Sequence, residues 1–306
     1  MFAKTILRVS KILWAAPIVL FGLVWTAVCM GFTFFGGASC AVLIRVFKMQ
    51  IDNPFTVMPR IWGWSLRQVF FRWAFVHVFV ENTARPFMPG ERAIIGANHG
   101  SLLSMLINVW GSVMFMPNPV RWVIKRELMR WWKIGPALKM IGLAWDIDRS
   151  RGDEANAALA TMGDGFARGS AEILIEGTRP TNSNMQDGRD YYVGRGERHH
   201  AQRLRVTARP RPNGFRTILL TTPHERRIRM LVTSSTHEEG FWGLVDLMFS
   251  GAIFLRIEEW SEPLHPRESV FVEELNEMWL GHVQSWIIAK RDGWVVCKRT
   301  KWWGSL

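Results

Sequence analysis

The chain has 306 residues, 48% of them hydrophobic, which is enough for one large domain with a substantial core or for two small ones. Its three cysteines have neither the spacing of a metal site nor that of a disulfide framework, and so sparse a count favours a reducing compartment. A net charge of +12 indicates an anionic partner, either nucleic acid or anionic lipid, and the seventeen tryptophans favour a membrane–water interface.

The first 50 residues are predicted to be a membrane anchor. Between Ile12 and Ile44 no residue is charged. As one helix this run of roughly 33 residues would be about 50 Å long, which exceeds the bilayer's hydrocarbon core of about 30 Å. A break at Gly36-Gly37 would give a hairpin with both basic flanks in the cytoplasm, and a single tilted span is the alternative.

Residues 51–90 contain a segment in which arginines alternate with aromatic residues. Over Phe55–Val80, Arg60, Arg67 and Arg72 are interleaved with tryptophans and phenylalanines. This pattern predicts an amphipathic helix at the membrane interface, with arginines reaching lipid phosphates. An ordinary buried helix with arginines at its edge is the other interpretation.

Residues 91–306 are predicted to form an α/β domain with a mixed, mostly parallel sheet flanked by helices. Short apolar runs read as strands, and helical patterns separate them. The predicted strands are "RAIIGAN", "VRWVIK", Ala144–Ile147, "AEILIEG", "TILLTT", "IRMLVTSS" and "FLRIEEW", and the predicted helices are Leu102–Met114, Leu128–Ile141, Asp153–Phe166 and Glu268–Lys290.

The polar stretch Gln186–Pro212 is predicted to be a surface loop or insertion. It contains His199-His200, a pair that suggests a metal ligand set. No acidic or cysteine partner with suitable sequence spacing lies near the pair, so we expect a solvated loop and no metal site.

Two polar clusters follow directly after predicted strands. His99 ends "RAIIGANH", and Glu176-Gly177-Thr178-Arg179 ends "AEILIEGTR". Functional sites of parallel sheets lie at the carboxyl ends of the strands. The sequence therefore predicts a site at this edge, with a histidine that only caps a turn as the alternative.

Four separated pieces, "NHGSLLS", "VIKRELMRWWKIGPALKMIG", "GLAWDIDR" and "ILIEGTRP", together resemble the glycerophospholipid acyltransferase family, typified by 1-acyl-glycerol-3-phosphate acyltransferases. "RPRPNGF" is similar to a Pro-Arg-x-x-Gly-Phe element in one branch of that family. The resemblance covers roughly Arg92 to Phe215, and it implies the family's α/β fold behind an N-terminal membrane segment.

The family's first motif is Asn-His, four residues, then Asp. The match implies that His99, preceded by Asn98, takes the proton from an acceptor hydroxyl as that hydroxyl attacks an acyl thioester. The Asp position is occupied by Ser104, which brings no negative charge, and no Asp or Glu lies between Gly96 and Lys125. In serine proteases an Asp-to-Asn change in the analogous role costs about 10⁴-fold.

The remaining pieces read as a clamp for the substrate phosphate. The resemblance implies that Lys125, Arg149 and Arg179 face the same phosphate, and the planar guanidinium of Arg179 suits bidentate recognition. Gly177 lets the backbone approach closely, and Glu176 orients Arg179 or a backbone amide beside Thr178. The resemblance implies no metal and no cofactor, and it implies acyl-CoA or acyl-acyl carrier protein as co-substrate. Because both donors are anionic, we expect the arginine-rich stretch Arg195–Arg229 to dock them.

The resemblance thus implies a membrane-bound O-acyltransferase that converts lysophosphatidic acid to phosphatidic acid. Its partners would be an anionic phospholipid membrane, a lysophospholipid and the acyl donor, with the site on the cytoplasmic face of a bacterial inner membrane or the endoplasmic reticulum. A catalytically weak or dead lipid-binding protein on the same fold is the alternative, because of Ser104. Nucleic-acid binding is disfavoured, since the basic residues accompany aromatic segments rather than one recognition helix.

Overall fold

The computed structural model describes residues 76–88, 90–100, 102–117, 120–130, 144–148, 152–166, 169–222, 227–236, 241–260 and 268–303, with short stretches before residue 69. The predicted membrane anchor lies largely outside these residues, as do Arg149 and most of the helix expected over Leu128–Ile141. Within the described part of the chain, no helix combines the length and the apolar character needed to cross a bilayer.

The described residues form a seven-stranded sheet with the order β1-β7-β6-β2-β5-β3-β4. All neighbouring strands are parallel except β6 and β7, so β2 to β6 have their carboxyl ends at one edge. This mixed, mostly parallel sheet confirms the α/β part of the predicted fold class. The strands are β1 (His77–Asn82), β2 (Ala93–Ala97), β3 (Val120–Lys125), β4 (Ala144–Ile147), β5 (Ser170–Leu174), β6 (Arg227–Ser235) and β7 (Ala252–Trp260).

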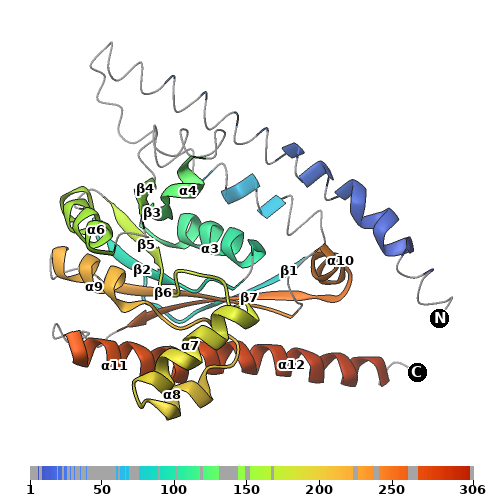
Figure 1. The fold of residues 1–306 in the computed structure, drawn as a ribbon. Helices are drawn as coiled ribbons and strands as arrows, with labels where there is room; N and C mark the ends of the chain where they lie inside the picture. The colour runs from blue at the N-terminus through green and yellow to red at the C-terminus, as the bar shows by residue number, and fades with distance from the viewer. Residues whose placement is uncertain are drawn as a thin grey trace.

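Helices cover both faces of this sheet, with α3 on one face and α11 and α12 on the other (Figure 1). The long carboxyl-terminal helix predicted for Glu268–Lys290 is present as α11, a π-helical turn and α12. The helices are α3 (Leu102–Phe115), α4 (Arg126–Met129), α6 (Gly152–Phe166), α7 (Asn182–Gly194), α8 (Arg198–Arg203), α9 (Pro212–Thr221), α10 (Phe241–Ser250), α11 (Glu268–Met278), η2 (Trp279–Val283) and α12 (Gln284–Trp303).

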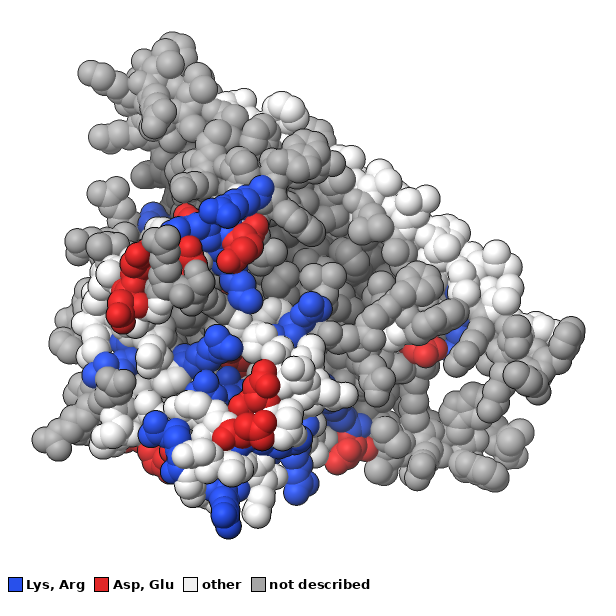
Figure 2. All heavy atoms as spheres, viewed as in Figure 1, with Lys and Arg blue, Asp and Glu red and all other residues white. Residues whose placement is uncertain are grey.

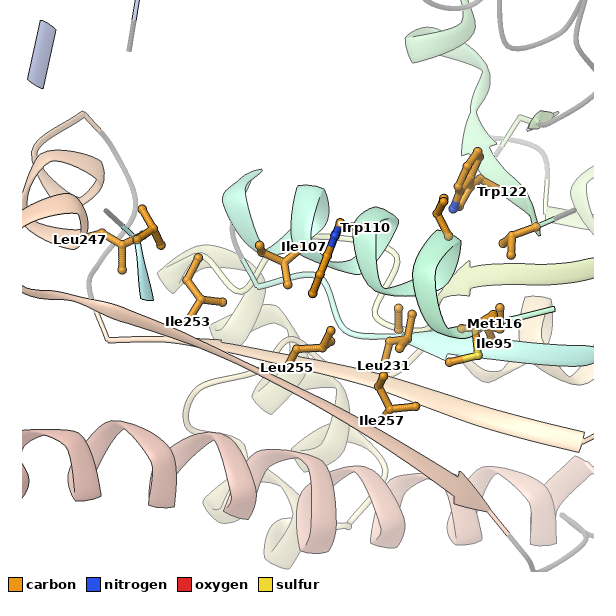
Figure 3. Packing of buried hydrophobic residues seen from close by; sticks show 14 of the residues in the cluster. Ile95, Ile107, Trp110, Met116, Trp122, Leu231, Leu247, Ile253, Leu255 and Ile257 are labelled. Carbon is orange, nitrogen blue, oxygen red and sulfur yellow. The ribbon is translucent and has the colours of Figure 1, made fainter. Parts of the chain in front are cut away.

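Each face of the sheet has its own apolar core. Because side chains alternate along a strand, Ile95 of β2 faces α3 and α10, whereas Ile94 faces α6, α9 and α11. Figure 3 shows Ile107 and Trp110 of α3 directed toward the sheet residues of the first core. Two packed layers hold the β2 backbone on both sides, which fixes the strand end that carries His99.

Three sequence predictions about secondary structure are wrong. The interfacial helix predicted for Phe55–Val80 is wrong at its carboxyl end, because residues 77–80 belong to the edge strand β1. "TILLTT" is the second half of α9 rather than a strand, since Pro212 starts a helix whose Phe215 and Ile218 are buried at helical spacing. The predicted loop Gln186–Pro212 contains most of α7 and all of α8, and His200 is fully buried.

Candidate active site at the carboxyl edge of the sheet

The ends of three adjacent strands bring the predicted site residues together. His99 follows β2, Glu176 follows β5, and Lys125 ends β3; β5 lies between the other two strands. The N–H of Ile175 donates to the carbonyl of Ala97 at 3.0 Å and extends the β2–β5 ladder to the point where both chains turn. The convergence of the Asn-His and Glu-Gly-Thr-Arg motifs on one edge is thus a property of the fold.

Asn98 ties the end of β2 to β6. Its side-chain amide donates to the carbonyl of Thr233 at 2.9 Å, and its Oδ1 accepts from the Thr233 N–H at 2.7 Å and from the Thr233 hydroxyl at 3.0 Å. The Asn98 carbonyl accepts from the Asn108 side chain on α3 at 2.7 Å. The bonds to Thr233 use both the nitrogen and the oxygen of the buried Asn98 side-chain amide, and the Asn108 bond holds the Asn98 backbone. Asn98 therefore positions the backbone that carries His99.

Glu176 joins the His99 backbone to the chain segment before α9. One carboxyl oxygen accepts from the His99 N–H at 2.5 Å, and the other accepts from the Ala208 N–H at 2.8 Å. The side chain is 1% exposed, and burial raises the pKa of Glu176 to about 8, against the lowering effect of the two backbone donors. Glu176 therefore acts as a bridge at the bottom of the site, within hydrogen-bonding distance of the His99 backbone.

The turn that carries Arg179 is held by α7. Gly177 has a φ of +67°, a conformation that residues with a Cβ rarely adopt, and its N–H donates to the Leu174 carbonyl at 3.0 Å. The Asn184 side chain donates to the Thr178 hydroxyl at 3.0 Å and to the Arg179 carbonyl at 2.8 Å. The backbone of this turn is thus fixed, and the Arg179 side chain is exposed.

An ion-pair cluster connects the ends of β3 and β4 beside Lys125. The Arg126 guanidinium lies 3.2 Å from an Asp146 carboxylate oxygen and 3.4 Å from one of Asp148. These contacts place the "DID" sequence next to the Lys125 end of β3. Arg149, which follows directly, lies outside the described residues.

A pocket of about 980 Å³ opens next to the Gly177 turn. Its lining combines apolar residues from the strand ends and α6 with Tyr191, Arg195, Arg209 and Arg211. The Arg209 guanidinium lies 3.6 Å from the centre of the Tyr191 ring, and the Arg211 N–H donates to the Ile175 carbonyl at 2.8 Å. Figure 2 shows Lys and Arg side chains gathered, together with acidic ones, over the α7–α8 region.

The predicted docking stretch Arg195–Arg229 does not act as one surface. Arg227 and Arg229 lie at the amino end of β6, at the opposite edge of the sheet from His99. Both are buried and paired with carboxylates: Arg227 lies 2.6 Å from Glu91, and Arg229 lies 3.1 Å from Glu259. Only the first part of the stretch therefore borders the pocket.

The sequence reasoning missed Asn108 and Asn184. Asn108 lies one helical turn after Ser104 in an otherwise apolar segment of α3, and a polar residue at that spacing is a detectable signal. Asn184 follows the N-cap Thr181 by three residues, a position that only the observed start of α7 reveals. Ser104 lies in the first turn of α3, but its side chain is not among those that the structure describes.

No protein-family model matches the sequence, and comparison with curated proteins gives no significant match. Among solved structures, the chain is similar to the crystal structure of the 1-acyl-sn-glycerophosphate (LPA) acyltransferase PlsC from Thermotoga maritima. The two are 15% identical with a TM-score of 0.52, and the match covers 89% of this chain and 97% of the other. The shared fold supports the mixed α/β sheet flanked by helices that the sequence motifs imply.

Proposed function

We propose that the protein transfers a fatty acyl chain from an acyl thioester to a lysophospholipid, most simply lysophosphatidic acid, giving phosphatidic acid. The observation that carries this proposal is the hydrogen bond from the His99 N–H to Glu176, which joins two motifs 77 residues apart at one sheet edge. It is supported by the fold shared with an LPA acyltransferase.

In the proposed reaction His99 acts as the general base. Its imidazole takes the proton of the acceptor hydroxyl while the oxygen attacks the thioester carbonyl, and the resulting imidazolium returns the proton to the departing thiolate. An ester bond forms and the carbon–sulfur bond breaks, so atoms and charge balance without a metal or cofactor. Ser104, in place of the usual Asp, would stabilise the imidazolium only as a neutral hydrogen-bond acceptor.

The acceptor phosphate is assigned to Lys125, Arg149 and Arg179. The support is that β3 and β5 are neighbours and that the backbone of the Gly177–Arg179 turn is held by Asn184. A guanidinium on a fixed turn loses little freedom when it grips a phosphate with two parallel bonds. Glu176, Gly177 and Thr178 set the shape of this turn.

The anionic acyl donor, acyl-CoA or acyl-acyl carrier protein, is assigned to the pocket bordered by Arg195, Arg209 and Arg211. Its mixed apolar and basic lining suits a ligand with a hydrophobic part and phosphate groups. Association with anionic phospholipid follows from the charge-free run Ile12–Ile44 and its basic flanks, with the site on the cytoplasmic face of a bacterial inner membrane or the endoplasmic reticulum.

The test is to supply labelled acyl-CoA or acyl-acyl carrier protein, with lysophosphatidic acid, to membranes that contain the protein. We expect labelled phosphatidic acid to form, and a Ser104→Asp variant to form it faster because the restored carboxylate stabilises the imidazolium. If neither form makes product with either donor, acyl transfer to this acceptor is excluded.

The second candidate function is lipid binding without catalysis, which Ser104 favours. It predicts that the protein binds vesicles containing lysophosphatidic acid, that Arg179→Ala abolishes this binding, and that no donor yields product. Faster turnover in Ser104→Asp than in the wild type, with measurable wild-type activity, excludes this alternative.

A further inference from the structure

The His199-His200 pair of α8 lies opposite two glutamates of α11. His200 Nε2 is 2.9 Å from an oxygen of Glu277 and 3.7 Å from one of Glu273, and His199 Nε2 is 3.7 Å from the same Glu277 oxygen. One ligand atom from each of the four side chains lies within 4.8 Å of all the others. The sequence near the histidines offers no acidic partner with suitable spacing. The two glutamates that face the pair in the structure lie more than 70 residues further along the chain.

Glu197 fixes the orientation of the His200 ring. Its carboxylate lies 3.2 Å from His200 Nδ1, and Nε2 on the other side of the ring lies 2.9 Å from Glu277, so the ring is held between carboxylates with Nε2 directed at α11. When a metal replaces the proton on Nε2, Nδ1–H donates to Glu197. Histidines that bind metals are commonly held in this way by a carboxylate on the far nitrogen. His200 is fully buried, whereas the side chains of His199, Glu273 and Glu277 are about half exposed, so an ion in solution can reach the cluster.

The charge of the cluster favours a cation. Among the described residues, Arg195 pairs with Glu197 at 2.8 Å, and Arg203 holds both oxygens of Glu277 at 2.8 and 2.7 Å. Glu273 lies 3.7 Å from the imidazole of His200, and no Lys or Arg in the described part of the chain forms an ion pair with it, so these five charged side chains carry one more negative than positive charge when the histidines are neutral. Arg203 competes for Glu277, but a carboxylate oxygen can accept more than one partner.

We propose that His199, His200, Glu273 and Glu277 bind one Zn²⁺ ion. Two imidazoles and two carboxylates are a donor set that zinc takes with four-coordinate geometry. Zinc–ligand bonds of about 2.0–2.2 Å require the four atoms to approach one another more closely than in the free cluster. The exposed side chains of His199 and Glu273 supply that movement, while His200 stays in place.

Zinc at this position joins α8 to α11 beside the proposed donor pocket. Tyr191 and Arg195 of the α7 region and Ser269 and Val272 of α11 line that pocket. An ion that links the two helical regions therefore restrains two walls of the pocket. The binding itself does not depend on the proposed acyl transfer.

The test is calorimetric titration of the full-length protein with Zn²⁺ alone. We expect one ion per chain, with the dissociation constant raised at least about tenfold in both His199→Gln and Glu273→Gln. Both substitutions are on exposed side chains, so folding is preserved. Glu197→Gln, which removes the carboxylate behind His200, should raise the constant about 10- to 100-fold.

The matched controls change the same residue types outside the cluster. Glu274→Gln is the next residue on α11, and His282→Gln is an exposed histidine of η2; both should bind zinc as the wild type does. The proposal is overturned if the wild type binds no zinc, if the three cluster variants bind as tightly as the wild type, or if the controls weaken binding equally.

Discussion

Replacing Glu176 with Gln should flatten the pH dependence of stability. The folded protein holds the Glu176 proton with a pKa of about 8, compared with 4.5 for an ordinary glutamate. Between these values the folded state binds more protons than the unfolded state, so its free energy of unfolding falls as the pH rises. Below 4.5 and above about 8 this group makes no further contribution to the slope.

The size of the effect follows from the shift. Each pKa unit corresponds to about 1.36 kcal/mol, so the wild type should lose on the order of 4 kcal/mol through Glu176 between pH 5 and pH 9. Burial also raises the pKa of Glu172 to about 7, so that residue has released most of its proton before Glu176 does. Between pH 7 and pH 8 Glu176 therefore contributes the larger part of the slope.

The assay is urea unfolding at pH 5, 7, 8 and 9 in a mild detergent. Glu176→Gln should carry a constant cost of about 1–3 kcal/mol, because its amide nitrogen faces the N–H of His99 or Ala208 and leaves one buried donor without an acceptor. Its stability should fall clearly less than that of the wild type between pH 7 and pH 8, because only the smaller contribution of Glu172 remains. An equal slope in both proteins over that interval would show that Glu176 does not titrate there and that the reasoning is incorrect.

Three further substitutions test other parts of the site. Asn98→Ala removes the side-chain bonds to Thr233 and should lower the urea-unfolding free energy by about 2 kcal/mol or more, whereas a change below about 0.5 kcal/mol would contradict its positioning role. Gly177→Ala places a Cβ on a residue at φ +67°, which should cost about 1–2 kcal/mol and reduce kcat/KM; unchanged stability would mean that the turn tolerates a side chain. Arg179→Ala should raise KM for lysophosphatidic acid at least about tenfold without changing the melting temperature, and the exposed Arg205→Ala should leave both unchanged; equal effects of the two would remove Arg179 from the phosphate site.

The part of the fold nearest the site was predictable because its strands are short, apolar and closed by turn residues. "AIIGA" is buried on both faces, and Gly96 fits because an added Cβ would lie 2.5 Å from Ile175 and 2.6 Å from Met230. The same reasoning failed for "TILLTT", where the strand propensity of Thr and Ile gave way to a helix that starts at Pro212. Local propensity determines the secondary structure of a segment only where tertiary packing favours the same structure.

The sequence motifs named residues for the candidate site but not the contacts that connect them. The motif spacing identified His99 and Glu176, but their hydrogen bond depends on the adjacency of β2 and β5, which no local pattern encodes. The burial of His200 against Glu277 was hidden for the same reason, because the partner lies on another helix. Contacts between distant segments arise from the topology, and single-sequence reasoning places them only where it predicts that topology.

The most direct test of the central claim is the rate of phosphatidic acid formation by His99→Ala compared with His282→Ala. The first variant removes the proposed base, and the second removes an exposed histidine of η2. General-base catalysis contributes about 10²–10⁴-fold, so His99→Ala should lose that factor in kcat while still binding lysophosphatidic acid, and His282→Ala should keep the wild-type rate. Wild-type turnover in His99→Ala would contradict the account.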